Sequence, residues 1–307
     1  LQSQLTLLKN QFADLPHRQQ TMRAAIHWSY DLLDDAEKRV FEGLSVFVGG
    51  FTLEAAEFLF EADAKDFDVL DLIERLVVKN LLIANESSDS GVRFGMLEAV
   101  KEFSFELLSA HGELSIFQKR HAEYFADLGQ RADSELTSAN QSGWISRLEE
   151  DINNLRKAIN WLLANDPDSA LDLLTNIHLF LNYRSYFAEG RNWLETAIEK
   201  SSDKPSSQLG RSYKALALLS WKQGDYETAR RSYAKTLEIG EILNDDLTMA
   251  TAFNGFAIIA YLQNEILKAR SFYEKALPLS RTINNANLIR SVLMGLGEIA
   301  RIEEDFD

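Results

Sequence analysis

Two stretches of the sequence repeat one another at a fixed spacing, and this repeat most constrains what the chain can fold into. The matched positions are Gly224 and Asn264, Ala229 and Ala269, and Tyr233 and Tyr273, and the offset is the same in all three pairs. Small residues let two antiparallel helices approach closely, and large aromatic residues fill the gap to the next pair. Since one helical pair cannot bury its own apolar face, the pattern predicts stacked helical hairpins.

Further copies flank these two. One begins at Gly295 and stops, incomplete, at Asp307, and a degenerate copy lies upstream. We therefore expect a repeat domain over 166–307, with repeats at about 171–209, 210–249, 250–289 and 290–307. The pattern resembles the tetratricopeptide repeat family, whose usual repeat is ~34 residues. The repeat here is longer, and its extra residues fall at 242–248 and 283–288, so the helices or the turns there should be longer than usual.

The first helix of each hairpin should face a groove. The register places these side chains there: Arg211, Lys214, Leu218, Trp221, Lys222, Asn254, Ile258, Tyr261, Met294, Glu298 and Arg301. An aromatic and cationic groove suits a peptide or an acidic ligand, and therefore a protein or small-molecule inducer. A solvated face with exposed Lys and Arg is the equal alternative. The carboxylate clamp of chaperone-binding repeats is not met, because Leu218 stands where asparagine is expected.

Residues 21–110 differ in kind. Thr52 can cap a helix over 53–60, and Asp68 can cap another over 69–80. Two short apolar runs then flank a polar turn, which predicts a β-hairpin, and a last helix follows to Ala110. Helices feeding a two-stranded wing make a winged helix-turn-helix. The expected fold class is mainly α: a winged-helix domain with a small β-hairpin wing, followed by an α-α superhelix of helical hairpins.

Residues 111–165 read as a helical bridge between these parts, with apolar side chains at helical spacing up to the stop at Pro167. The tryptophans that we expect to anchor the core are Trp28, Trp144, Trp161 and Trp193. No apolar stretch is long enough to span a bilayer. The chain has no cysteine, which excludes disulfides and thiolate metal sites and favours a reducing, cytoplasmic setting.

Charge argues against direct nucleic-acid binding. The net charge is −15, and residues 21–110 hold 8 Lys and Arg against 18 Asp and Glu. Such a surface repels phosphate backbones. The candidate recognition helix offers Arg75 and Lys79 but also Asp71 and Glu74, so a packing and switching role is favoured over DNA reading. Sequence-specific DNA binding through the winged helix remains a third hypothesis.

Enzymatic motifs are missing from the sequence. None of the five histidines has the spacing of a zinc site, and no nucleophile elbow occurs. Gly295-x-Gly297 superficially matches a dinucleotide fingerprint, but it lies inside an expected repeat helix with no preceding strand. We therefore expect no catalytic residues, no metal and no cofactor in this chain.

Several strings resemble bacterial STAND ATPases, the NB-ARC-like signal-transducing proteins that include transcriptional regulators. They are residues 15–33, 44–47, 49–56, 76–82, 94–103 and 154–161. The resemblance implies the order nucleotide-binding domain, helical domain, winged helix and sensor repeats, so residues 1–20 would be the tail of a preceding domain. It also implies ATP or ADP in the intact protein and places His17 where it could face the nucleotide. Where many relatives have Met-His-Asp, with the histidine on the ADP phosphate, Leu97 follows Met96, and leucine cannot donate to a phosphate.

No phosphate-binding Gly-x-x-x-x-Gly-Lys-Ser/Thr loop occurs in the chain, so it should not hydrolyse ATP alone. The first hypothesis is thus the winged-helix and sensor part of a STAND-type regulator. In it, the repeats bind an inducer or a partner protein, and the winged helix relays this event to an upstream nucleotide-binding domain in cis. The second hypothesis is a stand-alone adaptor whose repeats bind a partner peptide.

Overall fold

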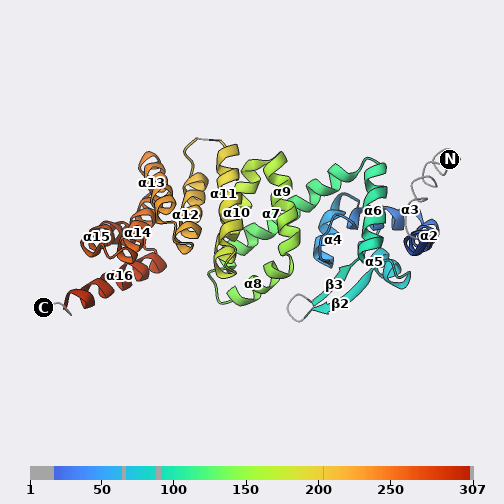
Figure 1. Ribbon diagram of the computed structural model, residues 1–307, viewed down its shortest axis with the longest axis horizontal. Coiled ribbons are helices and arrows are strands. Elements are labelled where there is room, and N and C mark those ends of the chain that lie inside the picture. Colours follow the sequence, from blue (N-terminus) through green and yellow to red (C-terminus); the bar gives the residue numbers. More distant parts are fainter. Residues whose placement is uncertain (1–16, 64–66, 88–90, 203, 305–307) are drawn as a thin grey trace. The chain divides into compact units, whose positions relative to one another are not determined.

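The computed structural model describes residues 17–63, 67–87, 91–202 and 204–304 (Figure 1). It is mainly helical with one small three-stranded sheet, which confirms the predicted fold class. Its contacts divide the chain into two compact units: unit 1 up to Phe125 together with Ser146–Ala158, and unit 2 with Ala126–Ile145 and everything from Ile159. The domain boundaries expected at residues 20, 110 and 165 stay predictions.

Unit 1 begins with a run of short helices. They are α2 (His17–Asp31), α3 (Asp35–Leu44), α4 (Leu53–Leu59), the 3-10 turn η1 (Glu61–Asp63), α5 (Val69–Val78) and α6 (Glu98–Ala110). Side-chain caps fix three of their starts. Thr52 accepts a bond from the amide of Ala55, and Asp68 accepts from the amides of Leu70 and Asp71, as the sequence predicts. At α3, Asp34 and Glu37 form a reciprocal capping box.

The hairpin predicted after α5 is present as β2 (Ile83–Ser87) and β3 (Gly91–Gly95), with its tip at 88–90 outside the described residues. A third strand, β1 (Phe51–Thr52), pairs antiparallel with the other edge of β3, so the strand order is β1-β3-β2. Phe94 of β3 lies opposite both Phe51 and Ala84. The sheet thus joins the start of α4 to the end of α5.

Three more helices follow: α7 (Leu114–Glu135), α8 (Gln141–Glu150) and α9 (Ile152–Asn165). The fully buried Asn154 of α9 fixes the loop after α3. Its Oδ1 accepts from the Val48 amide at 2.6 Å, and its Nδ2 donates to the Gly50 carbonyl at 2.8 Å. Nδ2 also lies 3.1 Å from the Asp151 carboxylate. One side chain therefore satisfies two part-buried backbone groups that have no helix or sheet partner.

In unit 2, α10 to α15 form three consecutive antiparallel pairs and α16 follows them, coloured yellow to red in Figure 1. These helices are α10 (Pro167–Tyr183), α11 (Phe187–Lys200), α12 (Ser207–Lys222), α13 (Tyr226–Leu243), α14 (Asp246–Leu262), α15 (Ile266–Thr282) and α16 (Ala286–Glu304). Each helix contacts the next, and α10, α12, α14 and α16 also contact one another in order. The surplus residues lengthen the helices, because the connection between α13 and α14 is very short.

Packing between hairpins repeats with the sequence. An added side chain at Gly255 would meet the Tyr233 ring at 2.2 Å, and one at Gly295 would meet the Tyr273 ring at 2.2 Å. Glycine is needed there because each buried tyrosine ring lies directly on the next hairpin's first helix. The two glycines have the same offset in the sequence as the two tyrosines.

The turn inside each hairpin explains a second matched pair. Gly224 and Asn264 both adopt left-handed backbone, with φ of 82° and 60°. Glycine and asparagine tolerate that conformation best, so they exchange at this position of the repeat.

Arginine pairs join successive hairpins. Arg191 of α11 reaches Asp225 before α13 at 2.7 Å, and Arg230 of α13 reaches Glu265 before α15 at 3.0 Å. Both arginines lie on the second helix of one hairpin, and both carboxylates lie at the turn of the next. The same join therefore recurs along the array.

One expectation about the core was wrong. Trp193 is buried, but Trp28 is 67% exposed on α2, and no described element covers it. Its helix is only weakly amphipathic, since Met22 is also exposed while Ile26 is buried, so apolar spacing overstated the buried face. No helix among the described residues is long and apolar enough to cross a membrane.

Candidate functional site: a polar groove on the repeats

The first helices of the repeats enclose a groove of about 670 Å³ in unit 2. Its lining comes mainly from α12, α14 and α16: Thr137, Ser207, Gly210, Arg211, Lys214, Thr236, Asp245, Leu247, Thr248, Thr251, Asn254, Asn285, Asn287, Leu288 and Ser291. The lining is rich in neutral hydrogen-bonding side chains and holds two cations. Its single carboxylate, Asp245, is used to cap α14.

Three of the predicted groove residues, Arg211, Lys214 and Asn254, line this groove. The other eight are placed elsewhere. Trp221, Ile258 and Tyr261 are partly buried against the hairpin cores, and Leu218 is half-buried. The exposed side chains are Lys222, which stacks on the Trp221 ring, and Met294, Glu298 and Arg301 of α16. The groove is thus less aromatic than the sequence register suggests.

Sequence reasoning missed the groove's small polar residues. Thr251, Ser207 and Ser291 carry no chemical signature of their own, and they matter only because three helices bring them together. Their position in the repeat was the available signal, since Ser291 occupies the same repeat position as Thr251. Asn254 links two helices of the groove, with its Oδ1 3.3 Å from the Ser291 hydroxyl.

The two cations of the groove differ in their partners. The guanidinium of Arg211 lies 2.7 Å from the Asp133 carboxylate and 3.3 Å from the Asn176 amide oxygen. Lys214 is half-buried and makes no hydrogen bond or ion pair with the described residues. Burial, and then the neighbouring Arg211, lower the pKa of Lys214 despite the opposing effect of Asp133. A half-buried ammonium without a direct partner is costly, so an anionic group in the groove would be stabilised.

His178 of α10 lies behind these cations. Its Nδ1 is 2.6 Å from the Thr175 carbonyl, and its Nε2 is buried without a described partner. Burial, followed by the positive charge of Lys214, lowers the pKa of His178 to about 3. The imidazole is therefore neutral in the folded protein at neutral pH.

This shift predicts acid sensitivity of the repeats. The unfolded chain protonates His178 below pH ~6.5, whereas the folded chain does so only near pH 3. Its contribution to stability is therefore complete above pH 6.5 and is lost as the pH falls toward 3, at up to ~1.4 kcal/mol per pH unit. Urea unfolding between pH 7 and 4 should show a shallower decline for His178→Leu than for the wild type. Parallel curves would contradict the assignment.

The candidate recognition helix of unit 1 offers little to DNA. Arg75 of α5 lies 2.6 Å from Asp71 and 3.9 Å from Asp34. Lys79, just after the helix, donates to both oxygens of the buried Glu37 at 2.6 Å. Both cations that could meet a phosphate already face carboxylates, while Asp71 and Glu74 are exposed.

The family resemblance drew attention to His17 and Leu97 as positions near a nucleotide. His17 is the first residue of α2, and its side chain lies outside the described residues. Leu97 precedes α6 as its N-cap residue, forms no side-chain cap, and is 59% exposed.

One protein-family model matches part of the repeats. Residues 208–282 match the tetratricopeptide repeat family. The match covers α12 to α15, the two hairpins whose sequences align with each other. The remainder of the chain lies outside it.

Curated relatives were found for part of the chain. Proteins of Mycobacterium tuberculosis and Mycobacterium bovis named "Putative HTH-type transcriptional regulator" are 33% identical over 184 residues, which is 59% of this chain. The matched segment spans only 20% of their length. The regulators are therefore much longer proteins than the portion compared.

Two solved structures were also similar. One is a Signal Transduction ATPase with Numerous Domains (STAND) protein with a tetratricopeptide repeat sensor from Pyrococcus horikoshii, with 18% identity, a TM-score of 0.46, and coverage of 90% of this chain and 42% of that one. The other is BtubC from P. vanneervenii, with 14% identity, a TM-score of 0.46, and coverage of 62% and 85%.

Proposed function

We propose that this chain is the regulatory and sensor segment of a signal-transducing regulator, with the polar groove of its repeats as the sensing site. The observation that carries this proposal is Lys214, a half-buried cation without a direct partner at a 670 Å³ groove. The tetratricopeptide match over 208–282 and the 33% identity to the named regulators support it. The ligand is an inducer or partner protein that presents an anionic group to Lys214.

The second part of the proposal concerns unit 1. Its helices and hairpin act as a winged helix that relays ligand binding to a nucleotide-binding domain of a STAND-type ATPase, which would bind ATP or ADP. The resemblance of residues 15–33, 76–82, 94–103 and 154–161 to that family supports the relay. This segment itself is not a catalyst. The relay requires a phosphate-binding loop encoded upstream of Leu1, and reading the gene there decides the matter.

Unit 1 does not bind DNA directly in this proposal. The carboxylates that face Arg75 and Lys79 support this view, as does the excess of acidic residues over 21–110. Any contact with target genes would belong to another part of the protein.

Peptide binding tests the sensing site. Arrays of peptides with free C-terminal carboxylates, duplicated with amidated ends, should contain ligands whose affinity falls about ten-fold or more on Lys214→Met, because a desolvated charge pair is lost. Lys222→Met on the same helix is the matched control, since Lys222 is exposed and does not line the groove. Equal losses from both variants, or ligands indifferent to Lys214→Met, would rule out the groove as the sensor.

The second candidate function is a stand-alone adaptor that binds a partner peptide through the same groove. The peptide-sized groove favours it as much as it favours a sensor. A gene without an upstream phosphate-binding loop, together with Lys214-dependent peptide binding, would select the adaptor.

A further inference from the structure

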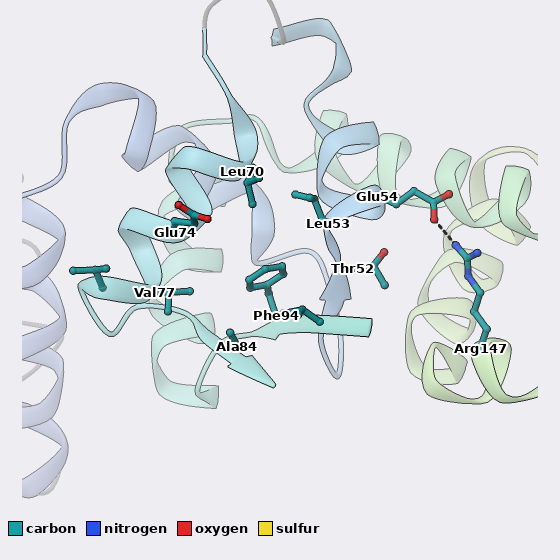
Figure 2. Close-up of a pocket in the computed structure, with 11 residues that line it drawn as sticks. Thr52, Leu53, Glu54, Leu70, Glu74, Val77, Ala84, Phe94 and Arg147 are labelled. Atoms are coloured by element: carbon teal, nitrogen blue, oxygen red, sulfur yellow. Dashed lines mark hydrogen bonds and ion pairs between the residues drawn. The ribbon is translucent and has the colours of Figure 1, made fainter. Parts of the chain in front are cut away.

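Unit 1 carries a larger hollow that the proposed sensing function does not use. Its volume is about 950 Å³, and it lies between α5, the sheet and the start of α4 (Figure 2). The lining residues are Thr52, Leu53, Glu54, Leu70, Glu74, Val77, Val78, Ala84, Val92, Phe94 and Arg147. All of them belong to unit 1.

The hollow is apolar and open to solvent. Figure 2 shows Leu53, Leu70, Val77 and Phe94 arranged around it. Leu70 is 39% exposed, Val92 is 49% exposed and Val78 is 81% exposed. A folded protein rarely leaves several large apolar side chains exposed around one concavity unless a partner covers them.

The charged side chains around the hollow indicate which kind of partner it would bind. Among the charged residues of the lining, Glu54 is held by Arg147 at 2.5 Å, whereas Glu74 makes no hydrogen bond or ion pair with the described residues. Residues 21–110 carry a large excess of carboxylates. A partner that brings a cation beside Glu74 is therefore favoured, and a phosphate-rich partner is not.

The shape suits a helix. Leu70, Glu74, Val77 and Val78 lie on one stripe of α5, and from Leu70 to Val78 that helix rises ~12 Å, about two turns. A partner helix laid along this stripe would place apolar side chains at i, i+4 and i+7 against it, the usual arrangement of a helix bound in a groove.

We propose that this hollow docks an amphipathic helix of a partner protein, with an apolar ridge seated between α5 and the sheet and a lysine or arginine paired with Glu74. This inference is independent of the repeat groove and goes beyond the proposed sensing function.

The test uses the intact chain and three fluorescent peptides, each long enough for about four helical turns. The first has leucines at i, i+4 and i+7 flanked by lysines, the second has glutamates in place of those lysines, and the third has the lysines with scrambled leucines. In fluorescence anisotropy the first should bind about ten-fold more tightly than either of the others. Val78→Asp and Val92→Asp should each weaken it about ten-fold, and Glu74→Lys should shift the preference to the glutamate peptide.

The matched control is Leu267→Asp, which changes an exposed leucine, 79% exposed, on α15 in unit 2 and should leave binding unchanged. Because Val78 and Val92 are exposed, their variants should keep the wild-type circular dichroism spectrum. Equal binding of the scrambled peptide, or indifference to both valine variants, would overturn the proposal. So would a Val78-dependent dimer in sedimentation, or Val78-dependent binding of a short DNA duplex.

Discussion

Valine in place of Gly255 should lower the free energy of unfolding of the repeat unit by about 3 kcal/mol. The first carbon of any side chain there would lie 2.2 Å from the Tyr233 ring, which is buried and has little room to move. Overpacking of this kind forces a helix or a ring to shift, and the stacking of α14 on the preceding hairpin is what would give way. Urea unfolding followed by circular dichroism measures the loss.

The matched control for Gly255→Val is Gly297→Val. Gly297 lies in α16, and a side chain there would meet nothing within 4 Å. Its replacement changes helix propensity alone, which is worth less than ~1 kcal/mol. The double variant Tyr233→Leu with Gly255→Val should lose less unfolding free energy than the two single variants lose in total, because the smaller side chain at position 233 removes the clash. Similar effects at positions 255 and 297 would contradict this account of the stacking.

Leucine in place of Asn154 should lower the free energy of unfolding of unit 1 by about 3 kcal/mol. The change leaves the Val48 amide and the Gly50 carbonyl without their described partner, and it removes a donor from Asp151. An unpaired polar group that water cannot reach costs ~1–3 kcal/mol, and leucine restores none of these bonds. Loss of the loop should appear as early amide exchange at Val48 and as a lower urea midpoint.

Asn153→Leu is the control for Asn154→Leu, one position earlier on α9. Asn153 is exposed, and its one described bond is to Arg156 at 3.1 Å. Exposed changes of this kind usually alter stability by no more than ~0.5 kcal/mol. If the two leucine variants have the same urea midpoint, the stability of the loop after α3 does not depend on Asn154.

Periodicity made much of the fold predictable. The constant repeat spacing predicted the hairpins of 207–282, and Thr52 and Asp68 marked helix starts because capping is a local interaction. The very short strand β1 forms only through its partner β3, so no local pattern announces it. Trp28 shows the opposite failure, since a tryptophan signals burial only where another element covers it.

The candidate sites were less predictable, because they depend on which distant residues meet. Arg211 and Lys214 were expected in the groove, yet only the structure places Asp133 beside one of them. Likewise, Lys79 counts as a free cation in the sequence until it is seen on Glu37, 42 positions earlier. The apolar hollow of unit 1 combines residues from β1, α4, α5, β2, β3 and α8, which are too far apart in the sequence to be recognised as one site.

The arginine joins between hairpins have a consequence for how such a protein could evolve. Arg191 with Asp225, and Arg230 with Glu265, repeat one geometry at nearly the same spacing. Duplication or deletion of a whole block would recreate the same junction, so descendants could acquire longer or shorter arrays without redesigning any contact. An insertion inside one of the paired helices would instead rotate the arginine away from its carboxylate, and selection should remove it.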